Sequence, residues 1–89
     1  MNAIVTVIGK DQVGIIAGVC TKLSECSVNV LDISQTVMEG YFTMMMVVDT
    51  EKCTVPFDQL AAQMGTYGDE RDLTIRVQRK DIFDAMHRI

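Results

Sequence analysis

The fold is decided by residues 3–33, which read AIVTVIGKDQVGIIAGVCTKLSECSVNVLDI. The alternating apolar run at the start predicts a strand over roughly residues 2–8. After the loop 9–14, apolar residues recur at helical spacing and predict an amphipathic helix: Ile15, Ile16, Val19, Cys20 and Leu23. A strand that turns through a glycine-containing loop into a helix leaves free backbone N–H groups at the positive end of the helix dipole. The loop is therefore the predicted place of function.

Two more strands follow this unit. Val28–Met38 and Tyr41–Thr50 have strand-like patterns, and only Glu39 and Gly40 separate them. A two-residue connection that contains glycine is typical of a tight hairpin. The two strands are therefore predicted to be antiparallel neighbours.

The remaining residues predict a helix, a strand and a short terminal helix. Pro56 suits the first turn of the helix, with Thr54 or Val55 as its cap. Its buried stripe is predicted to be Phe57, Leu60, Ala61 and Met64, and its end is predicted at the glycines Gly65 and Gly68. Leu73–Gln78 alternates cleanly as a strand with one buried face. From Asp81 a final amphipathic segment presents Ile82, Phe83, Met86 and Ile89 for docking on the body or on a neighbouring chain.

The order βαββαβ is the ferredoxin-like arrangement of the α+β class. It predicts a sandwich in which a four-stranded antiparallel sheet carries two helices on one face, with the short C-terminal helix added. In the strand at 41–50 both faces are apolar, since Met44 and Met46 lie on one face and Met45 and Val47 on the other. Something should therefore cover part of the second face, either a partner subunit or the C-terminal helix.

Composition narrows the function. At 89 residues the chain is one domain, and 48% apolar with 22% charged residues is a globular composition. The net charge of −4 argues against nucleic acid, which is held through clustered Lys and Arg. The absence of a leader pattern or a long apolar run argues against export and membrane insertion, so a cytoplasmic protein is expected.

Metal and cofactor chemistry also lack support in the sequence. Cys20, Cys26 and Cys53 form no C-x-x-C pair and are odd in number, which argues against a zinc site and against a disulfide framework. Cys20 is interpreted as a small buried hydrophobe and His87, the only histidine, as a solvated residue near a helix end. No cofactor and no catalytic residue is predicted.

Three residues around the first loop have two interpretations each. Asp11 could cap the helix by accepting a hydrogen bond from Val13 or Gly14, or its carboxylate could receive a ligand's ammonium group. Gly14 could permit close helix packing or an unusual dihedral angle, or could let a ligand approach the backbone. Asn29 could close the preceding turn or could face a ligand.

The stretch Gly9–Ile16, followed after the helix by Ser27–Ile33 with its V-N-V strand, resembles the ACT domain. The resemblance covers about the first 80 residues. It is strongest to stand-alone bacterial ACT proteins, including relatives of the ACT domains of the glycine-cleavage-system transcriptional repressor. It implies an ACT domain over residues 1–80 and a helical extension over residues 81–89.

The resemblance also implies a site. Amino-acid effectors of ACT domains commonly bind where the first loop of one subunit meets the second strand of another. By matching positions, the loop residues would be Asp11, Gln12, Val13, Gly14 and Ile15, and the strand residues would be Asn29 and Val30. Val13 departs from the family pattern, which often has proline there.

The resemblance implies a non-enzymatic regulatory module that forms a homo-oligomer, most simply a dimer, and binds a small amino acid between subunits. One alternative is a module that only dimerises or binds a protein. Another is a small hydrolase resembling acylphosphatase, but its phosphate-holding arginine is missing, since the first loop supplies only Lys10.

Overall fold

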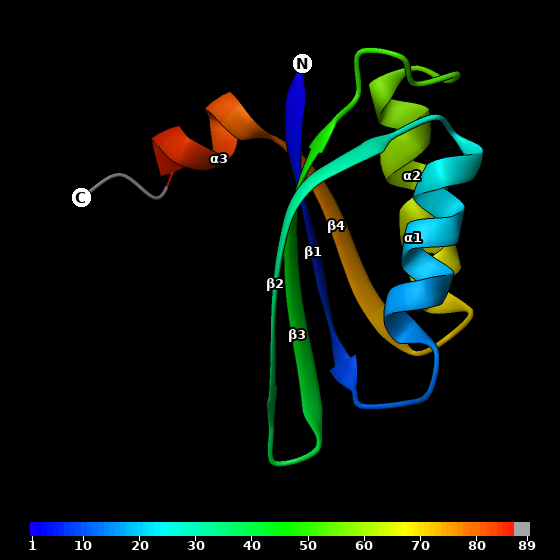
Figure 1. The fold of residues 1–89 in the computed structure, drawn as a ribbon, viewed down its shortest axis with the longest axis vertical. Coiled ribbons are helices and arrows are strands. Elements are labelled where there is room, and N and C mark those ends of the chain that lie inside the picture. Colours follow the sequence, from blue (N-terminus) through cyan, green and yellow to red (C-terminus); the bar gives the residue numbers. More distant parts are fainter. Residues whose placement is uncertain (87–89) are drawn as a thin grey trace.

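The computed structural model describes residues 1–86. Figure 1 shows seven elements in chain order: β1 (Asn2–Lys10), α1 (Ile15–Glu25), β2 (Asn29–Met38), β3 (Tyr41–Asp49), α2 (Phe57–Asp69), β4 (Leu73–Arg79) and α3 (Lys80–Met86). The order of the first six is βαββαβ, as predicted. Each strand agrees with its prediction to within two residues at either end.

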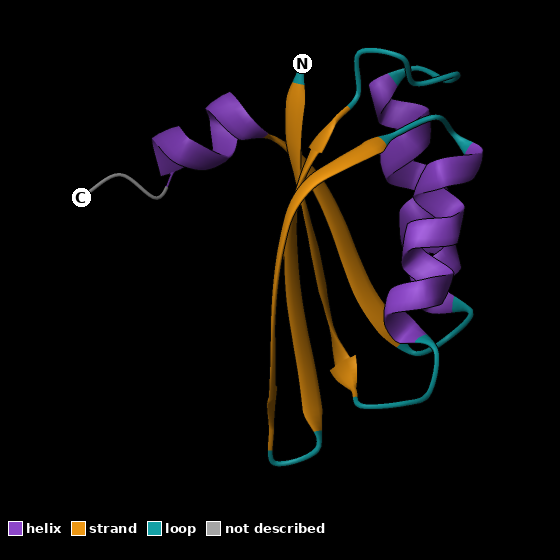
Figure 2. Ribbon diagram, viewed as in Figure 1, coloured by secondary structure: helices purple, strands orange, loops and turns teal. Residues whose placement is uncertain are grey.

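The strands form one antiparallel sheet in the order β2-β3-β1-β4. Figure 2 shows α1 and α2 together on one face of this sheet and α3 on the opposite side. The predicted ferredoxin-like α+β class is confirmed. We call the sheet face that α1 and α2 leave uncovered the open face.

The core lies between the sheet and the α1–α2 layer. Alternate strand residues point into it, including Val5 and Val7 of β1 and Met44 and Met46 of β3. Burying such side chains contributes about 1.5–3 kcal/mol each, which is the main force that holds this layer to the sheet. On α1, Ile15, Val19 and Leu23 are buried.

Two members of the predicted α1 stripe lie outside the core. Ile16 is exposed, and Cys20 is half-buried at the core edge. The prediction that Cys20 is a buried residue is thus only partly correct. The buried face of α1 is therefore narrower than the apolar pattern suggested.

The boundaries of α2 differ from the prediction. Pro56 is the residue that precedes the helix, with ψ 154°, so neither Thr54 nor Val55 is the cap. The helix continues through Gly65 and Gly68 to Asp69. Gly68 is a packing residue: a Cβ there would lie 2.6 Å from the Leu73 carbonyl oxygen, so the absent side chain is what lets α2 approach β4.

The β2–β3 connection is the predicted two-residue hairpin. Glu39 and Gly40 both have positive φ, 51° and 81°. Positive φ at both central positions is the pattern of a type I′ turn, whose twist matches that of the two strands. Asp11 donates its backbone N–H to the Gly40 carbonyl at 2.7 Å, which ties this hairpin to the end of β1.

The C-terminal helix exists and begins at Lys80, one residue before the predicted start. It places Phe83, half-buried, and Met86 on the open face. His87 and Ile89, for which the sequence predicted a solvated and a docking role, lie outside the described residues. None of the helices within residues 1–86 has the length and apolar character needed to cross a membrane.

Candidate functional site

The loop after β1 begins later than predicted. β1 continues to Lys10, which pairs with Tyr41, and α1 begins at Ile15 with Gly14 as the residue before it. No side chain caps this helix, so the interpretation of Asp11 as its cap is wrong. Within residues 1–86 no hydrogen bond or ion pair uses the Asp11 carboxylate, which leaves it available to a ligand.

Of the next two loop residues, one is bonded to another part of the domain and the other is fully exposed. The Gln12 side chain donates from Nε2 to the Arg71 carbonyl at 3.2 Å, a contact with the turn that precedes β4. Val13 is fully exposed. Gln12 therefore has an anchoring role that the sequence did not indicate, while the Val13 side chain is in contact with water.

Gly14 has φ 85° and ψ 9°, the left-handed region that favours glycine. A Cβ at this position would meet nothing within 4 Å, so the close-packing interpretation is wrong and the dihedral interpretation is correct. The Gly14 carbonyl accepts from Gly18 N–H at 2.9 Å. The N–H groups before Gly18 have no acceptor within the helix and form its positive end.

Ile15, the last predicted loop residue, is 6% exposed and belongs to the core. Its side chain therefore cannot shape an outside pocket, and only its backbone N–H could reach a ligand.

The two predicted strand residues lie at the other end of the sheet. Asn29 is exposed and Val30 half-buried, at the start of β2. The preceding turn is closed by backbone bonds, with Val28 N–H donating to Leu23 O at 3.0 Å. Among the described residues no hydrogen bond involves the Asn29 side chain, so its turn-closing interpretation is not supported.

The structure does not bring the loop and Asn29 together within one chain. Asn29 pairs with Asp49, which also pairs with Asn2, whereas the loop follows Lys10 at the opposite end of the same ladder. The ladder from Asn2 to Lys10 is about 26 Å long at about 3.3 Å per residue. The candidate residues can share a pocket only if a second chain supplies one set.

The strand that carries Asn29 is an uncovered edge. β2 is ten residues long and every residue except half-buried Val30 is exposed. Large apolar side chains stand along it, with Ile33 at 42% and Val37 at 55% exposed. A bulge at Leu31 shifts the pairing register between Val30 and Asp32. A long apolar edge of this kind is a template for pairing with another strand.

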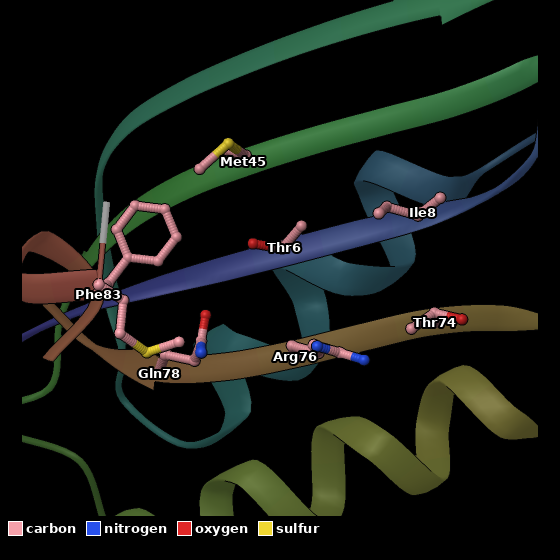
Figure 3. Close-up of a pocket in the computed structure, with 8 residues that line it drawn as sticks. Thr6, Ile8, Met45, Thr74, Arg76, Gln78 and Phe83 are labelled. Atoms are coloured by element: carbon pink, nitrogen blue, oxygen red, sulfur yellow. The ribbon is translucent and has the colours of Figure 1, made fainter. Parts of the chain in front are cut away.

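A second feature, which sequence reasoning missed, is a hollow of ≈ 610 Å³ on the open face. Figure 3 shows Thr6, Met45, Arg76, Gln78 and Phe83 around it. The sequence signal was the both-sided apolar pattern of β3, which predicted a cover by a partner or by the C-terminal helix. The helix supplies part of that cover, because α3 contributes Phe83 and Met86 at one end of the hollow and leaves the rest open.

No three His, Cys, Asp or Glu side chains within residues 1–86 are grouped so that they could hold a metal ion. The three cysteines are free thiols.

Comparison with known proteins decides the family. A family model described as "ACT domain" matches residues 2–78, which include the loop and every strand except the last residue of β4. The chain belongs to the ACT domain family. The match ends just before α3.

Relatives agree with this assignment. A UPF0237 protein of Listeria monocytogenes is 49% identical over the full length of both chains. The solved structure of an ACT domain protein from Streptococcus pneumoniae is 43% identical, covers 94% of each chain and superposes with a TM-score of 0.83.

A more distant likeness shows the fold alone. A protein assigned as a glycine cleavage system transcriptional repressor covers 89% of this chain and has a TM-score of 0.76 at 19% identity. This chain covers 45% of that protein. The resemblance to the ACT domains of such repressors is therefore structural, while the UPF0237 relatives match this ACT domain from end to end.

Proposed function

We propose that this ACT domain is a regulatory module that pairs with a second copy through β2 and binds a small amino acid between the two copies. The observation that carries the proposal is the uncovered β2 edge, with its exposed Ile33 and Val37, in a chain whose candidate site residues lie at opposite ends of the sheet.

Antiparallel pairing of two β2 strands would bring Asn29 of one copy near the loop 11–14 of the other. In such a pair the start of one strand lies opposite the end of the other, so Asn29 of one copy faces the Met38–Gly40 end of its partner. That end is bonded to the loop, since Asp11 N–H donates to Gly40 O. Asn29 of one copy and Asp11 of the other would then border the same space.

The groups in that space suit a zwitterion. The free carboxylate of Asp11 can accept an ammonium group, and the N–H groups at the start of α1 can donate to a carboxylate. Asn29 can donate and accept through its amide. Effector binding would stabilise the paired form, because a ligand that contacts both copies binds the pair better than the separated chains.

A thermal-shift screen against the twenty amino acids, repeated on Asp11→Asn and Asn29→Ala, tests the effector site. A ligand at a hundredfold its Kd adds roughly 2.7 kcal/mol, which moves the midpoint of a domain this small by several degrees. We expect a selective shift for one or a few amino acids that both substitutions abolish.

Asp69→Asn, an exposed carboxylate at the end of α2, is the matched control and should leave the shift unchanged. A chain that shifts with no amino acid but sediments as a dimer would support the alternative module that only pairs. A monomer at every concentration, with and without amino acids, would reject the proposal.

A further inference from the structure

The hollow on the open face has the size of a small-molecule site. Its volume, ≈ 610 Å³, lies inside the range of roughly 300–1,000 Å³ in which small-molecule pockets fall. Its lining residues come from β1, β3, β4 and α3, and none of them belongs to α1, to the loop 11–14 or to β2.

One part of the lining is apolar and comes from three elements. Ile8 of β1 and Met45 of β3 stand on the sheet, and Phe83 of α3 stands over its end (Figure 3). Ile8 is 45% and Met45 38% exposed, so this surface is in contact with water in the isolated chain. An apolar ligand body would displace that water.

The other part of the lining is polar and lies directly beside the first. Thr6 pairs with Arg76 on β4 and with Met45 on β3, so the Thr6 side chain lies between the cation and the methionine. Gln78 follows two residues after Arg76 on the same face. Within residues 1–86 the side chains of Thr6, Arg76 and Gln78 take part in no hydrogen bond or ion pair.

The neighbouring cations differ from Arg76. Arg79 is paired with Asp81 at 2.8 Å and Lys80 with Asp84 at 2.6 Å, which uses both carboxylates of α3. No carboxylate lines the hollow among the described residues. Arg76 is thus a cation whose surroundings offer hydroxyl and amide groups and no counter-charge.

We propose that this hollow binds a small organic monoanion with an apolar body, a carboxylate attached to a hydrocarbon or aromatic group. The guanidinium of Arg76 accommodates one carboxylate in a two-pronged hydrogen bond, supported by Thr6 and Gln78. The hydrocarbon lies against Met45 and Phe83. A zwitterionic amino acid is disfavoured, because no carboxylate among the described lining residues can pair with its ammonium group.

Octanoate, with the neutral octan-1-ol as its matched analogue, tests the proposal by titration calorimetry on the intact chain. We expect saturable octanoate binding that is about tenfold tighter than that of octan-1-ol, since one charge-assisted hydrogen-bonded pair carries the difference. Arg76→Gln should reduce octanoate affinity about tenfold and leave octan-1-ol unchanged. Phe83→Ala should weaken both.

Arg71→Gln is the control. Arg71 lies in the turn before β4 with its guanidinium over the Tyr67 ring, away from the hollow, so this substitution should not change octanoate binding. Equal affinity for octanoate and octan-1-ol, or octanoate binding that Arg76→Gln leaves intact, would overturn the proposal. Octanoate binding that weakens as protein concentration rises would also overturn it, because the open face would then be buried between two copies.

This inference does not depend on the proposed effector site. Asp11→Asn and Asn29→Ala should leave octanoate binding unchanged, and Arg76→Gln should leave the amino-acid shift unchanged. The failure of either proposal is therefore visible without the other.

Discussion

The two edge strands of the sheet, β2 and β4, have opposite surroundings. β4 lies under α2, which buries Leu73 and Ile75, and its chain continues into α3. β2 is longer, is bulged at its start and carries exposed apolar side chains along most of its length. The fold thus buries one face of the edge strand β4 under its own helix and leaves the large apolar side chains of β2 exposed.

Ile75 and Ile33 offer the sharpest test of this comparison, because the same residue type stands on each edge. Ile75 is 7% and Ile33 is 42% exposed. We expect Ile75→Ala to lower the free energy of unfolding by about 2–4 kcal/mol, through lost burial and a cavity, and Ile33→Ala by less than about 1 kcal/mol. Urea denaturation at low micromolar protein concentration measures both.

The comparison would fail if the two substitutions lowered the free energy of unfolding equally at every protein concentration. A cost of Ile33→Ala that grows with concentration would instead show that Ile33 becomes buried against a second copy.

Two glycines of α2 test how tightly β4 is covered. Gly68→Ala should destabilise the domain by about 1–3 kcal/mol, because its Cβ would lie 2.6 Å from the Leu73 carbonyl oxygen and 3.0 Å from the Ile75 side chain. Gly65→Ala is the matched control in the same helix. Its Cβ meets nothing within 4 Å, so the better helix propensity of alanine should stabilise the domain by up to about 1 kcal/mol.

Thermal or urea unfolding separates these two variants. If Gly68→Ala were as stable as Gly65→Ala, α2 could move away from β4 without cost, and the packing of α2 on β4 would not be tight.

Val37→Lys tests pairing through the β2 edge. Of the substitutions proposed here, it should change the stability of the single chain least. A lysine in an edge strand opposes pairing, so we expect the dimer Kd to rise about tenfold, which corresponds to about 1.4 kcal/mol, with little change in monomer stability. Thr66→Lys, an exposed position on α2 with the same change of charge, should leave the Kd unchanged. Sedimentation over a dilution series measures the Kd.

An unchanged sedimentation profile for Val37→Lys, in a chain that still dimerises, would place the interface elsewhere. The open face would then be the next surface to test.

Most of the fold could be predicted from local patterns. The periodicities of β1, β3 and β4, and the Glu39-Gly40 turn, depend on side-chain alternation and on backbone preferences that neighbouring residues determine. The predictions were wrong where contacts between distant parts of the chain determine the local structure. Gly68 was predicted to end the helix because its closeness to Leu73 is a contact between elements. Of the two interpretations of Asp11, the cap was wrong because β1 continues to Lys10 through its pairing with Tyr41.

The candidate site was only partly predictable for the same reason. The loop residues 11–14 and Asn29 were selected by their types and by the ACT resemblance, yet their separation of about 26 Å along the sheet follows from the strand register. The hollow beside Arg76 was not predicted at all, since Thr6, Met45 and Phe83 come from three elements far apart in the sequence.

The sequence by itself determined the element order, the family and the buried face of β4, because hydrophobic periodicity and turn chemistry depend on residues that are close together in the sequence. The tertiary structure decided which edge strand is packed under a helix, that the carboxylates of α3 pair with Arg79 and Lys80 and not with Arg76, and where α3 lies. Those properties depend on strand order and on helix packing, which join residues that the sequence keeps apart.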